Sequence, residues 1–347
     1  MTFEMAAILV LASSGSLGLT RYLISAYPMF DIPNDRSLHL QPIPRSGGIA
    51  IAGALYVCAA LAHLILGHGD RALLWLMATG FMLSCVSFAD DRFGLSVSLR
   101  FASHGLAAGL FVWASGASVG LVLLPGLGLI DFGDLASIVA VFCVMWMTNL
   151  YNFMDGMDGF ASGMSVVGFG FLAYFALVGA NETVFTGAAV VVAVALGFLF
   201  YNLPPAKVFM GNVGSVTLGF LAAGLSALGV RDGLFDFWVP ALIFSPFIVD
   251  ATFTLMKRLF RGDKIWLAHR QHFYQRLVLA GWSHRKTLSV EWFLMVASGM
   301  TAVLYQNAQA PAKAGILIVW ALVWLVLSLL VGVVERHNRR HRSEAIV

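Results

Sequence analysis

The stretch "ETVFTGAAVVVAVALGFLFYN", residues 182–202, has one charged residue near its start and is apolar for almost all of its length. Such a run is typical of a helix that crosses a membrane, because the hydrocarbon core of a bilayer requires about 20 mostly apolar residues per helix. The whole chain shares this character, since 59% of its 347 residues are hydrophobic and only 11% are charged. The composition excludes an ordinary soluble domain and predicts an all-α, polytopic membrane helix bundle.

Similar apolar runs precede and follow this stretch, and together they predict about eleven transmembrane helices. The expected helices cover residues 5–27, 47–67, 72–89, 98–117, 135–151, 159–180, 182–202, 213–230, 237–259, 288–306 and 313–334. The polar stretches between them are short. We therefore expect a single integral membrane domain over residues 1–347.

The basic residues divide the loops into two sets. Of the 21 Lys and Arg in the chain, one side carries 17, the other carries only Arg71, Arg231 and Lys313, and Arg21 lies inside the first helix. The basic side comprises residues 28–46, 90–97 with Arg100, 152–158, 203–212, 257–287 and the tail 335–347. Because basic loops stay in the cytoplasm, we expect the N-terminus outside and the C-terminus in the cytoplasm.

Polar motifs concentrate on this basic side. "FADDRFGLS", residues 88–96, ends the third expected helix with Asp90 and Asp91. Two adjacent carboxylates repel each other unless a cation is near, and hard oxygen ligands favour Mg²⁺ over zinc. The alternative is that the pair only caps and solvates the helix end.

"NLYNFMDGMDG", residues 149–159, joins the fifth and sixth expected helices. Asn152, Asp155 and Asp158 recur every three residues, so on a helical turn they would share one face. Their oxygens suit a metal ion or a nucleobase edge. Glycine after each Asp is also typical of a turn, and the two interpretations are compatible.

"PPAKVFMGNVGS", residues 204–215, places Lys207 and two glycines before the eighth expected helix. Backbone N–H groups at a helix start can bind phosphate, although a tight interhelical turn explains the segment equally well.

"AHRQHFYQR", residues 268–276, concentrates His269, Arg270, His272 and Arg276. Guanidinium groups bind phosphate oxygens, and imidazole can bond to hydroxyl groups, so the loop suits a diphosphate and a sugar. The alternative is topogenic charge with lipid headgroup contacts. Asp250, within an apolar helix, predicts either a part of the site or a structural ion pair.

Taken together, "DIPNDRSLHLQPIPRSGG", "FADDRFGLS", "NLYNFMDGMDG", "FMGNVGS" and the HRxH-type loop resemble, in order and spacing, the polyprenyl-phosphate N-acetylhexosamine-1-phosphate transferases of glycosyltransferase family 4. The last loop is more similar to the O-antigen-initiating branch than to the peptidoglycan translocase branch. The resemblance implies transfer of an N-acetylhexosamine-1-phosphate from a UDP-sugar to undecaprenyl phosphate with release of UMP. This reaction would initiate O-antigen (lipopolysaccharide) or related cell-surface polysaccharide synthesis. The resemblance thus implies a bacterial inner membrane, with the active site facing the cytoplasm.

The resemblance also implies roles for individual residues and for partners. Asp90, Asp91 and Arg100 would be catalytic, with Arg100 suited to the lipid phosphate. Mg²⁺, with Mn²⁺ as an alternative, would bind Asp91, Asn152 and Asn212. The nucleotide would contact Asp155, Asp158, Arg45, Ser46 and Gly47. The diphosphate and sugar would contact His269, Arg270, His272 and Lys207. Membrane lipids and a second copy of the chain are further expected partners, and nucleic acid is not.

One residue departs from the family pattern. Many relatives have Asp where this chain has Asn212, and that Asp is a metal ligand. Asn keeps a carbonyl oxygen but loses a charge, so we expect an active enzyme with a modified metal site. The competing functional class is a membrane transporter that uses intramembrane and inner carboxylates, although the motifs lie at one face rather than at the midplane.

Overall fold

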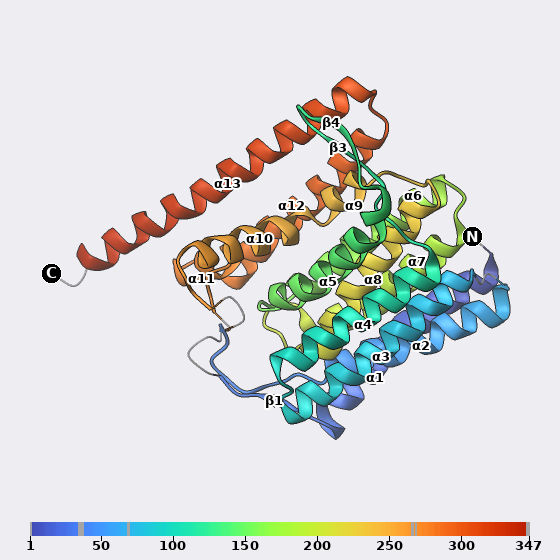
Figure 1. Ribbon diagram of the computed structural model, residues 1–347. Coiled ribbons are helices and arrows are strands. Elements are labelled where there is room, and N and C mark those ends of the chain that lie inside the picture. The colour runs from blue at the N-terminus through green and yellow to red at the C-terminus, as the bar shows by residue number, and fades with distance from the viewer. Residues whose placement is uncertain (1, 34–37, 68–69, 265–266, 268, 345–347) are drawn as a thin grey trace.

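The computed structural model describes residues 2–33, 38–67, 70–264, 267 and 269–344. Parts of three expected inner segments therefore lie outside the described residues, namely 34–37, 265–266 with 268, and 345–347. The helices are α1 Phe3–Ala26, α2 Gly47–Leu66, α3 Arg71–Phe93, α4 Val97–Ser115, α5 Ala136–Met154, α6 Phe160–Val178, α7 Glu182–Asn202, α8 Gly211–Arg231, α9 Trp238–Ile243, α10 Ser245–Phe260, α11 Phe273–Leu279, α12 His284–Gln306 and α13 Ala310–Glu344 (Figure 1).

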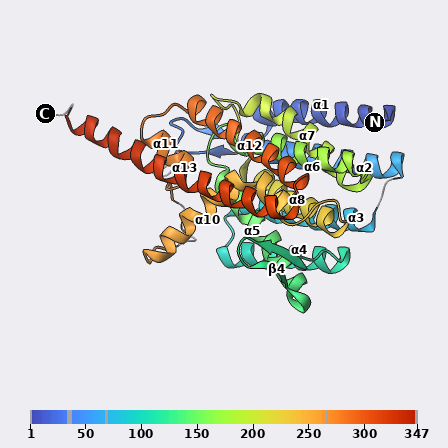
Figure 2. The ribbon, with the colours of Figure 1, turned by 90° about the horizontal axis from the view of Figure 1, so that it is seen from above.

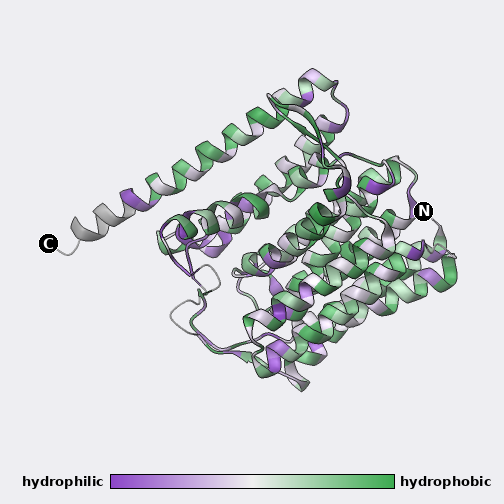
Figure 3. Cartoon of the chain, viewed as in Figure 1, coloured by the Kyte–Doolittle hydropathy of each residue, from purple (hydrophilic) through white to green (hydrophobic). Residues whose placement is uncertain are grey.

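Within the described ranges, ten helices are long and apolar enough to cross a membrane, which confirms the all-α membrane bundle. Strands occur only as two short antiparallel hairpins there, β1 (Phe30–Asp31) with β2 (Ile43–Pro44) and β3 (Leu121–Leu124) with β4 (Gly128–Asp131). Apolar residues cover the lengths of the helices, while hydrophilic residues gather toward the ends of the bundle (Figure 3). The two chain ends lie at opposite ends of the bundle in both ribbon views (Figures 1 and 2).

The prediction of one continuous helix over residues 237–259 is wrong. The chain breaks there at Phe244 into the short α9 and the longer α10. Pro246, in the first turn of α10, has no backbone N–H to donate to the carbonyl of Leu242, and its ring would clash with that carbonyl in a continuous helix. After the break, α10 carries Asp250, whose carboxylate bonds to the backbone of Phe273 at the start of α11.

Helix α8 lies at the centre of the bundle, between α2, α3, α5 and α7. Its close contact with α2 depends on Gly48, because a Cβ there would lie 2.3 Å from the backbone N of Gly214 and 2.4 Å from the carbonyl O of Met210. The Gly48 N–H donates to that same Met210 carbonyl at 2.8 Å. This contact brings the start of α2, and Arg45 just before it, beside the start of α8.

Candidate active site

A polar cavity of about 320 Å³ lies where α3 and α5 end and α8 begins. It brings together residues from every expected motif, far apart in the sequence. Its lining includes the predicted residues Arg45, Asp91, Asn152, Asp155, Asp158, Asn212 and His269. The convergence places the predicted metal, nucleotide and diphosphate residues around one space.

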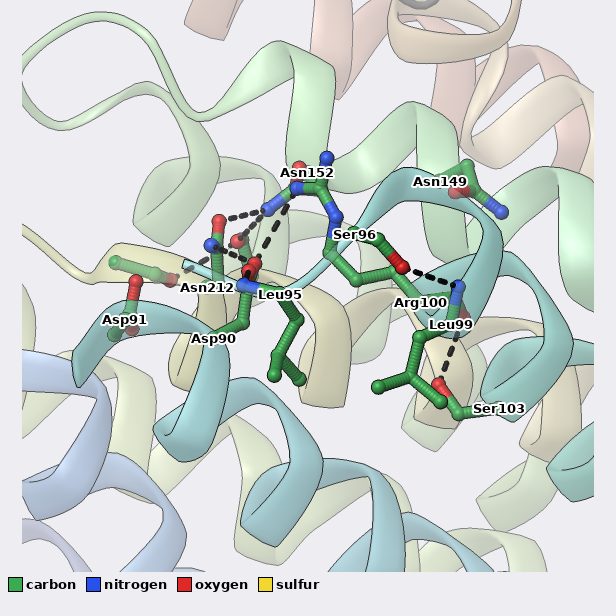
Figure 4. Close-up of polar contacts among 12 residues, drawn as sticks. Asp90, Asp91, Leu95, Ser96, Leu99, Arg100, Ser103, Asn149, Asn152 and Asn212 are labelled. Carbon is green, nitrogen blue, oxygen red and sulfur yellow. Dashed lines mark hydrogen bonds and ion pairs between the residues drawn. The ribbon is translucent and has the colours of Figure 1, made fainter. Parts of the chain in front are cut away.

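An apolar groove of about 570 Å³ adjoins this cavity. Side chains from α3, α4 and α5 line it, with Leu255 from α10, and Asp90 and Arg100 supply charge. Of the lining residues, Asn152 and Asn212 also line the polar cavity. The two spaces therefore meet at these two carboxamides, which Figure 4 shows beside Asp90.

The adjacent carboxylates Asp90 and Asp91 face different spaces. Asp90 lines the apolar groove, where its side chain accepts hydrogen bonds from Asn212 Nδ2 at 2.8 Å and from the backbone N–H of Leu95 at 2.8 Å. Its Oδ2 also lies 3.3 Å from Arg100 Nη1. The buried Asp90 is thus held by three donors, which supports a role in a site more than simple solvation of a helix end.

Asp91 lines the polar cavity and is less well satisfied. Its Oδ2 accepts a hydrogen bond from the backbone N–H of Val213 at 3.2 Å, whereas its Oδ1 lies 4.0 Å from Arg45 Nη1. That Oδ1 is buried and accepts no hydrogen bond from the part of the chain that the structure describes. A buried carboxylate oxygen without a donor calls for an explanation, and an ion or a water molecule at that oxygen would supply one.

A chain of side-chain amides links the two sides of the site. Asn152 Nδ2 donates to Asn212 Oδ1 at 2.8 Å and to Ser215 Oγ at 2.9 Å, and Asn212 in turn donates to Asp90. Asn212 is placed by Gly211, whose φ of +66° and proximity to Arg45 and Asp91 leave no room for a Cβ. The carboxamide of Asn212 therefore neutralises no charge but supplies a donor to Asp90.

The segment 155–159 is not a helical face, contrary to one interpretation of its spacing. Helix α5 ends at Met154, and Asp155 and Asp158 lie in the following turn. Both still line the cavity. Asp158 Oδ2 accepts a hydrogen bond from the backbone N–H of Ala206 at 2.9 Å, which ties this turn to the segment before α8.

Ionisation of Asp155 is electrostatically unfavourable in this site. Burial, together with repulsion from the carboxylates of Asp91 and Asp31, raises the pKa of Asp155 well above its usual range. Ionisation of this carboxyl therefore costs stability in the folded state, and the cost appears as the pH rises above its unfolded pKa of about 3.9. A cation in the cavity would remove that cost.

Asp155→Asn should consequently stabilise the metal-free protein. In the presence of a chelator, we expect the midpoint of thermal unfolding to be about 2 °C higher for the variant than for the wild type at pH 8. The difference should shrink as the pH falls to 5, because the wild-type carboxyl gains its proton. Differential scanning fluorimetry across this pH range is the measurement, and equal pH slopes for the two proteins would contradict the unfavourable ionisation of Asp155.

The HRxH-type loop divides between two spaces. His269 faces the polar cavity, and burial, with positive charge from His272 and Arg258, lowers its pKa to about 4. His269 is therefore neutral at pH 7 and suited to hydrogen bonding rather than to charge pairing. Arg270 instead lines a separate pocket with residues of α10 and α11.

Asp250 supports this loop from α10. Its Oδ1 lies 3.2 Å from Nδ1 of the buried His272, and both carboxylate oxygens accept the backbone N–H of Phe273 at 2.9 Å. Of the two alternatives for Asp250, the structure favours a supporting part of the site, because among the described residues its carboxylate bonds to this loop and to Thr254 of its own helix.

Four predicted residues line neither the polar cavity, nor the apolar groove, nor the pocket of Arg270, namely Lys207, Ser46, Gly47 and His272. Lys207 is exposed, Ser46 is the buried N-cap of α2, and Gly47 packs where a Cβ would meet Phe198 at 2.3 Å. Their assigned contacts stay predictions.

The sequence interpretation also missed His39, Asn202, Gln275 and His284, which line the cavity. His284 Nδ1 lies 3.9 Å from Asp158 Oδ2, and its position at a helix start after Ser283 on the basic side was the available signal.

Comparisons with known proteins agree with this site. The family model described as glycosyl transferase family 4 matches residues 72–230, which include the Asp90, Asn152 and Asn212 motifs. A probable undecaprenyl-phosphate N-acetylglucosaminyl 1-phosphate transferase of Bacillus subtilis (strain 168) is 29% identical over 88% of this chain and 85% of its own. A decaprenyl-phosphate N-acetylglucosaminephosphotransferase of Mycobacterium leprae (strain TN) is 27% identical over 96% of this chain and 90% of its own.

A third relative comes from a different branch. A phospho-N-acetylmuramoyl-pentapeptide-transferase of Staphylococcus carnosus (strain TM300) is 29% identical over 74% of this chain and 83% of its own. All three names describe transfer of a phosphorylated sugar, and the first two name a polyprenyl phosphate. Residues 72–230 thus match glycosyl transferase family 4, and these relatives support the resemblance to the polyprenyl-phosphate N-acetylhexosamine-1-phosphate transferases.

Proposed function

We propose that this protein transfers an N-acetylhexosamine-1-phosphate from a UDP-sugar to undecaprenyl phosphate and so initiates O-antigen or related polysaccharide synthesis. The observation that carries the proposal is the meeting of a polar cavity and an apolar groove at Asn152 and Asn212. A nucleotide sugar suits the first space, and a polyprenyl chain suits the second. Their reacting phosphates would meet between Asp90 and Asp91.

In the proposed reaction, an oxygen of the lipid phosphate forms a bond to the β-phosphorus of the donor. The bond from that phosphorus to the oxygen bridging the two phosphates breaks, and UMP leaves with the electron pair. Arg100, which lines the groove and lies 3.3 Å from Asp90, would hold the lipid phosphate. A phosphate monoester has a second pKa near 6, so the nucleophile is largely ionised at pH 7 and Asp90 serves mainly to position and to accept a residual proton.

The donor set supports Mg²⁺ as the metal. Within the described residues there is no group of three or more His, Cys, Asp or Glu side chains that could hold a metal ion, so carboxamide oxygens would have to contribute. Asp91, whose Oδ1 lacks a donor, and the amide oxygens of Asn152 and Asn212 are hard ligands of the kind that Mg²⁺ accepts together with substrate phosphates. Bound Mg²⁺ would neutralise charge on the diphosphate of the donor as the sugar-1-phosphate is transferred.

On the donor side, the neutral His269, Arg45 and the turn that carries Asp155 and Asp158 surround the space for the nucleotide and diphosphate. We infer that Asp158 and Asp155 contact the uridine and that His269 bonds to the diphosphate or sugar. The concentration of basic loops supports a cytoplasmic site in an inner membrane. The transporter alternative is not favoured, because the polar groups collect at one end of the bundle.

A donor panel tests the proposal. Purified protein would receive undecaprenyl phosphate, Mg²⁺ and, in separate reactions, UDP-linked N-acetylglucosamine, N-acetylgalactosamine, N-acetylfucosamine, N-acetylquinovosamine or N-acetylmuramoyl-pentapeptide. Mass spectrometry of the lipid fraction should show one N-acetylhexosamine linked through a diphosphate. If the muramoyl-pentapeptide donor is the only one that gives a product, the proposed N-acetylhexosamine specificity is wrong, whereas the resemblance to the family still holds.

Asn212→Asp tests the modified metal site. Because Asn212 already supplies a carbonyl oxygen and a donor to Asp90, we expect the variant to change kcat by less than about tenfold, with a lower Mg²⁺ concentration needed for half-maximal activity. Steady-state rates measured across a Mg²⁺ titration provide both quantities. A gain in turnover of several orders of magnitude would show that Asn212 disables the native site.

A further inference from the structure

A second polar pocket, of about 390 Å³, lies between α10, α11 and α13. Residues lining it include Lys257 and Arg261 from α10, Arg270 from the HRxH-type loop, Arg276 from α11 and Glu335 from α13. None of its lining residues also lines the polar cavity or the apolar groove of the candidate active site. The pocket is therefore a separate space on the other side of the loop that carries His269.

The charges in this pocket do not balance. Its lining holds four cationic side chains and one carboxylate. Arg276 donates to Glu335 through Nε at 2.9 Å and through Nη2 at 2.7 Å, so this carboxylate is engaged in a bidentate pair that joins α11 to α13. After this pair is counted, Lys257, Arg261 and Arg270 give the pocket lining a formal net charge of three positive charges. Such a concentration of positive charge in a concave site favours an anionic ligand.

The pocket is graded from apolar to basic along α10. Phe253, Lys257 and Arg261 follow one another at intervals of four residues, so they lie along one side of the helix. Phe253 and Leu279 give the pocket an apolar wall, and the basic residues occupy the end near the helix C-terminus. A ligand with an anionic head and an apolar body matches this gradient better than a free anion.

The position of α10 fits the membrane interface. Met256, Leu259 and Phe260 are exposed to 43%, 53% and 83%, respectively. Large apolar side chains beside Lys257 and Arg261 make α10 amphipathic, a property of helices that lie in the headgroup region. An anionic phospholipid would therefore reach the pocket from the bilayer itself.

We propose that the pocket formed by Lys257, Arg261, Arg270 and Arg276 binds a phosphate group, supplied by the headgroup of an anionic phospholipid whose acyl chains contact Phe253 and Leu279. This site is additional to the groove proposed for undecaprenyl phosphate. It does not depend on the proposed reaction, because it requires neither donor nor acceptor to be correctly identified.

Lipid binding to the purified full-length protein tests the site. Native mass spectrometry would follow titration with phosphatidylglycerol and, separately, with phosphatidylcholine. The double variant Lys257→Gln/Arg261→Gln should bind phosphatidylglycerol roughly 25-fold more weakly than the wild type, since each surface cation contributes about fivefold to the attraction of an anionic lipid. The control Arg92→Gln/Arg285→Gln removes two exposed cations that do not line the pocket and should retain wild-type binding.

A single variant and a competition with inorganic phosphate extend the test. Arg270→Gln changes a residue outside the helices and should weaken binding about fivefold even if the double variant fails to fold. Inorganic phosphate at millimolar concentration should displace little phosphatidylglycerol, and its binding as tightly as the lipid would overturn the phospholipid source in favour of a free anion. Equal binding of the two lipids by the wild type, or equal losses in the pocket and control variants, would overturn the site.

Discussion

Replacing Asp91 with Asn should lower the rate of sugar-1-phosphate transfer at least about 1000-fold. The substitution preserves the shape of the side chain and removes its charge from the cavity, where Oδ1 is buried and accepts no hydrogen bond from the described residues. Several kcal/mol of charge stabilisation is expected to depend on such a carboxylate and the cation it holds, which corresponds to a rate effect of this size. The measurement is kcat for UMP release at saturating donor and acceptor.

Asp70→Asn is the matched control for this prediction. Asp70 caps α3 at its opposite end and pairs with Arg231. Asn is also a good N-cap residue, so the control should fold and retain activity within about threefold of the wild type. Retention of more than a tenth of the wild-type rate by Asp91→Asn would show that the reaction does not depend on that carboxylate.

Replacing Gly48 with Ala should disrupt the contact between α2 and α8 and, with it, the active site. The added methyl group would meet backbone atoms of Gly214 and Met210 at 2.3 and 2.4 Å. Backbone atoms in two packed helices cannot rotate away as a side-chain end can, so the helices must separate, at a cost of about 3 kcal/mol or more. We expect the midpoint of thermal unfolding to fall by about 5 °C or more, or folded protein to be lost.

Gly18→Ala provides the comparison for Gly48. A Cβ at Gly18, in the middle of α1, would have no atom within 4 Å. Alanine has a higher helix propensity than glycine, so this control should be neutral or slightly more stable than the wild type. Equal unfolding midpoints for Gly48→Ala and the wild type would contradict the close approach of the two helices.

The length of apolar runs was sufficient to predict most of the fold, because a membrane helix must satisfy its backbone internally over a fixed thickness. It failed at 237–259, where hydropathy alone does not register the effect of Pro246 on a backbone hydrogen bond. The small hairpins between β1 and β2 and between β3 and β4 also escaped prediction. Strands this short carry too few residues for a periodic pattern.

The motifs predicted which segments would meet, but not which pocket each side chain would line. His269 and Arg270 are neighbours in the sequence, yet they line different pockets, because side chains in a loop do not follow a helical period. Gln275 and His284 reach the cavity from α11 and α12. Their contribution depends on the tertiary placement of those helices, which local sequence does not specify.

UMP release by the purified protein tests the central claim most directly. Reactions would contain the donor identified by the panel and would omit either undecaprenyl phosphate or Mg²⁺ in turn. Transfer between the polar cavity and the apolar groove predicts rapid UMP release only when the lipid and the metal are both present, with one lipid-linked sugar formed per UMP. UMP release at the same rate without the lipid would contradict a direct transfer at the junction formed by Asn152 and Asn212.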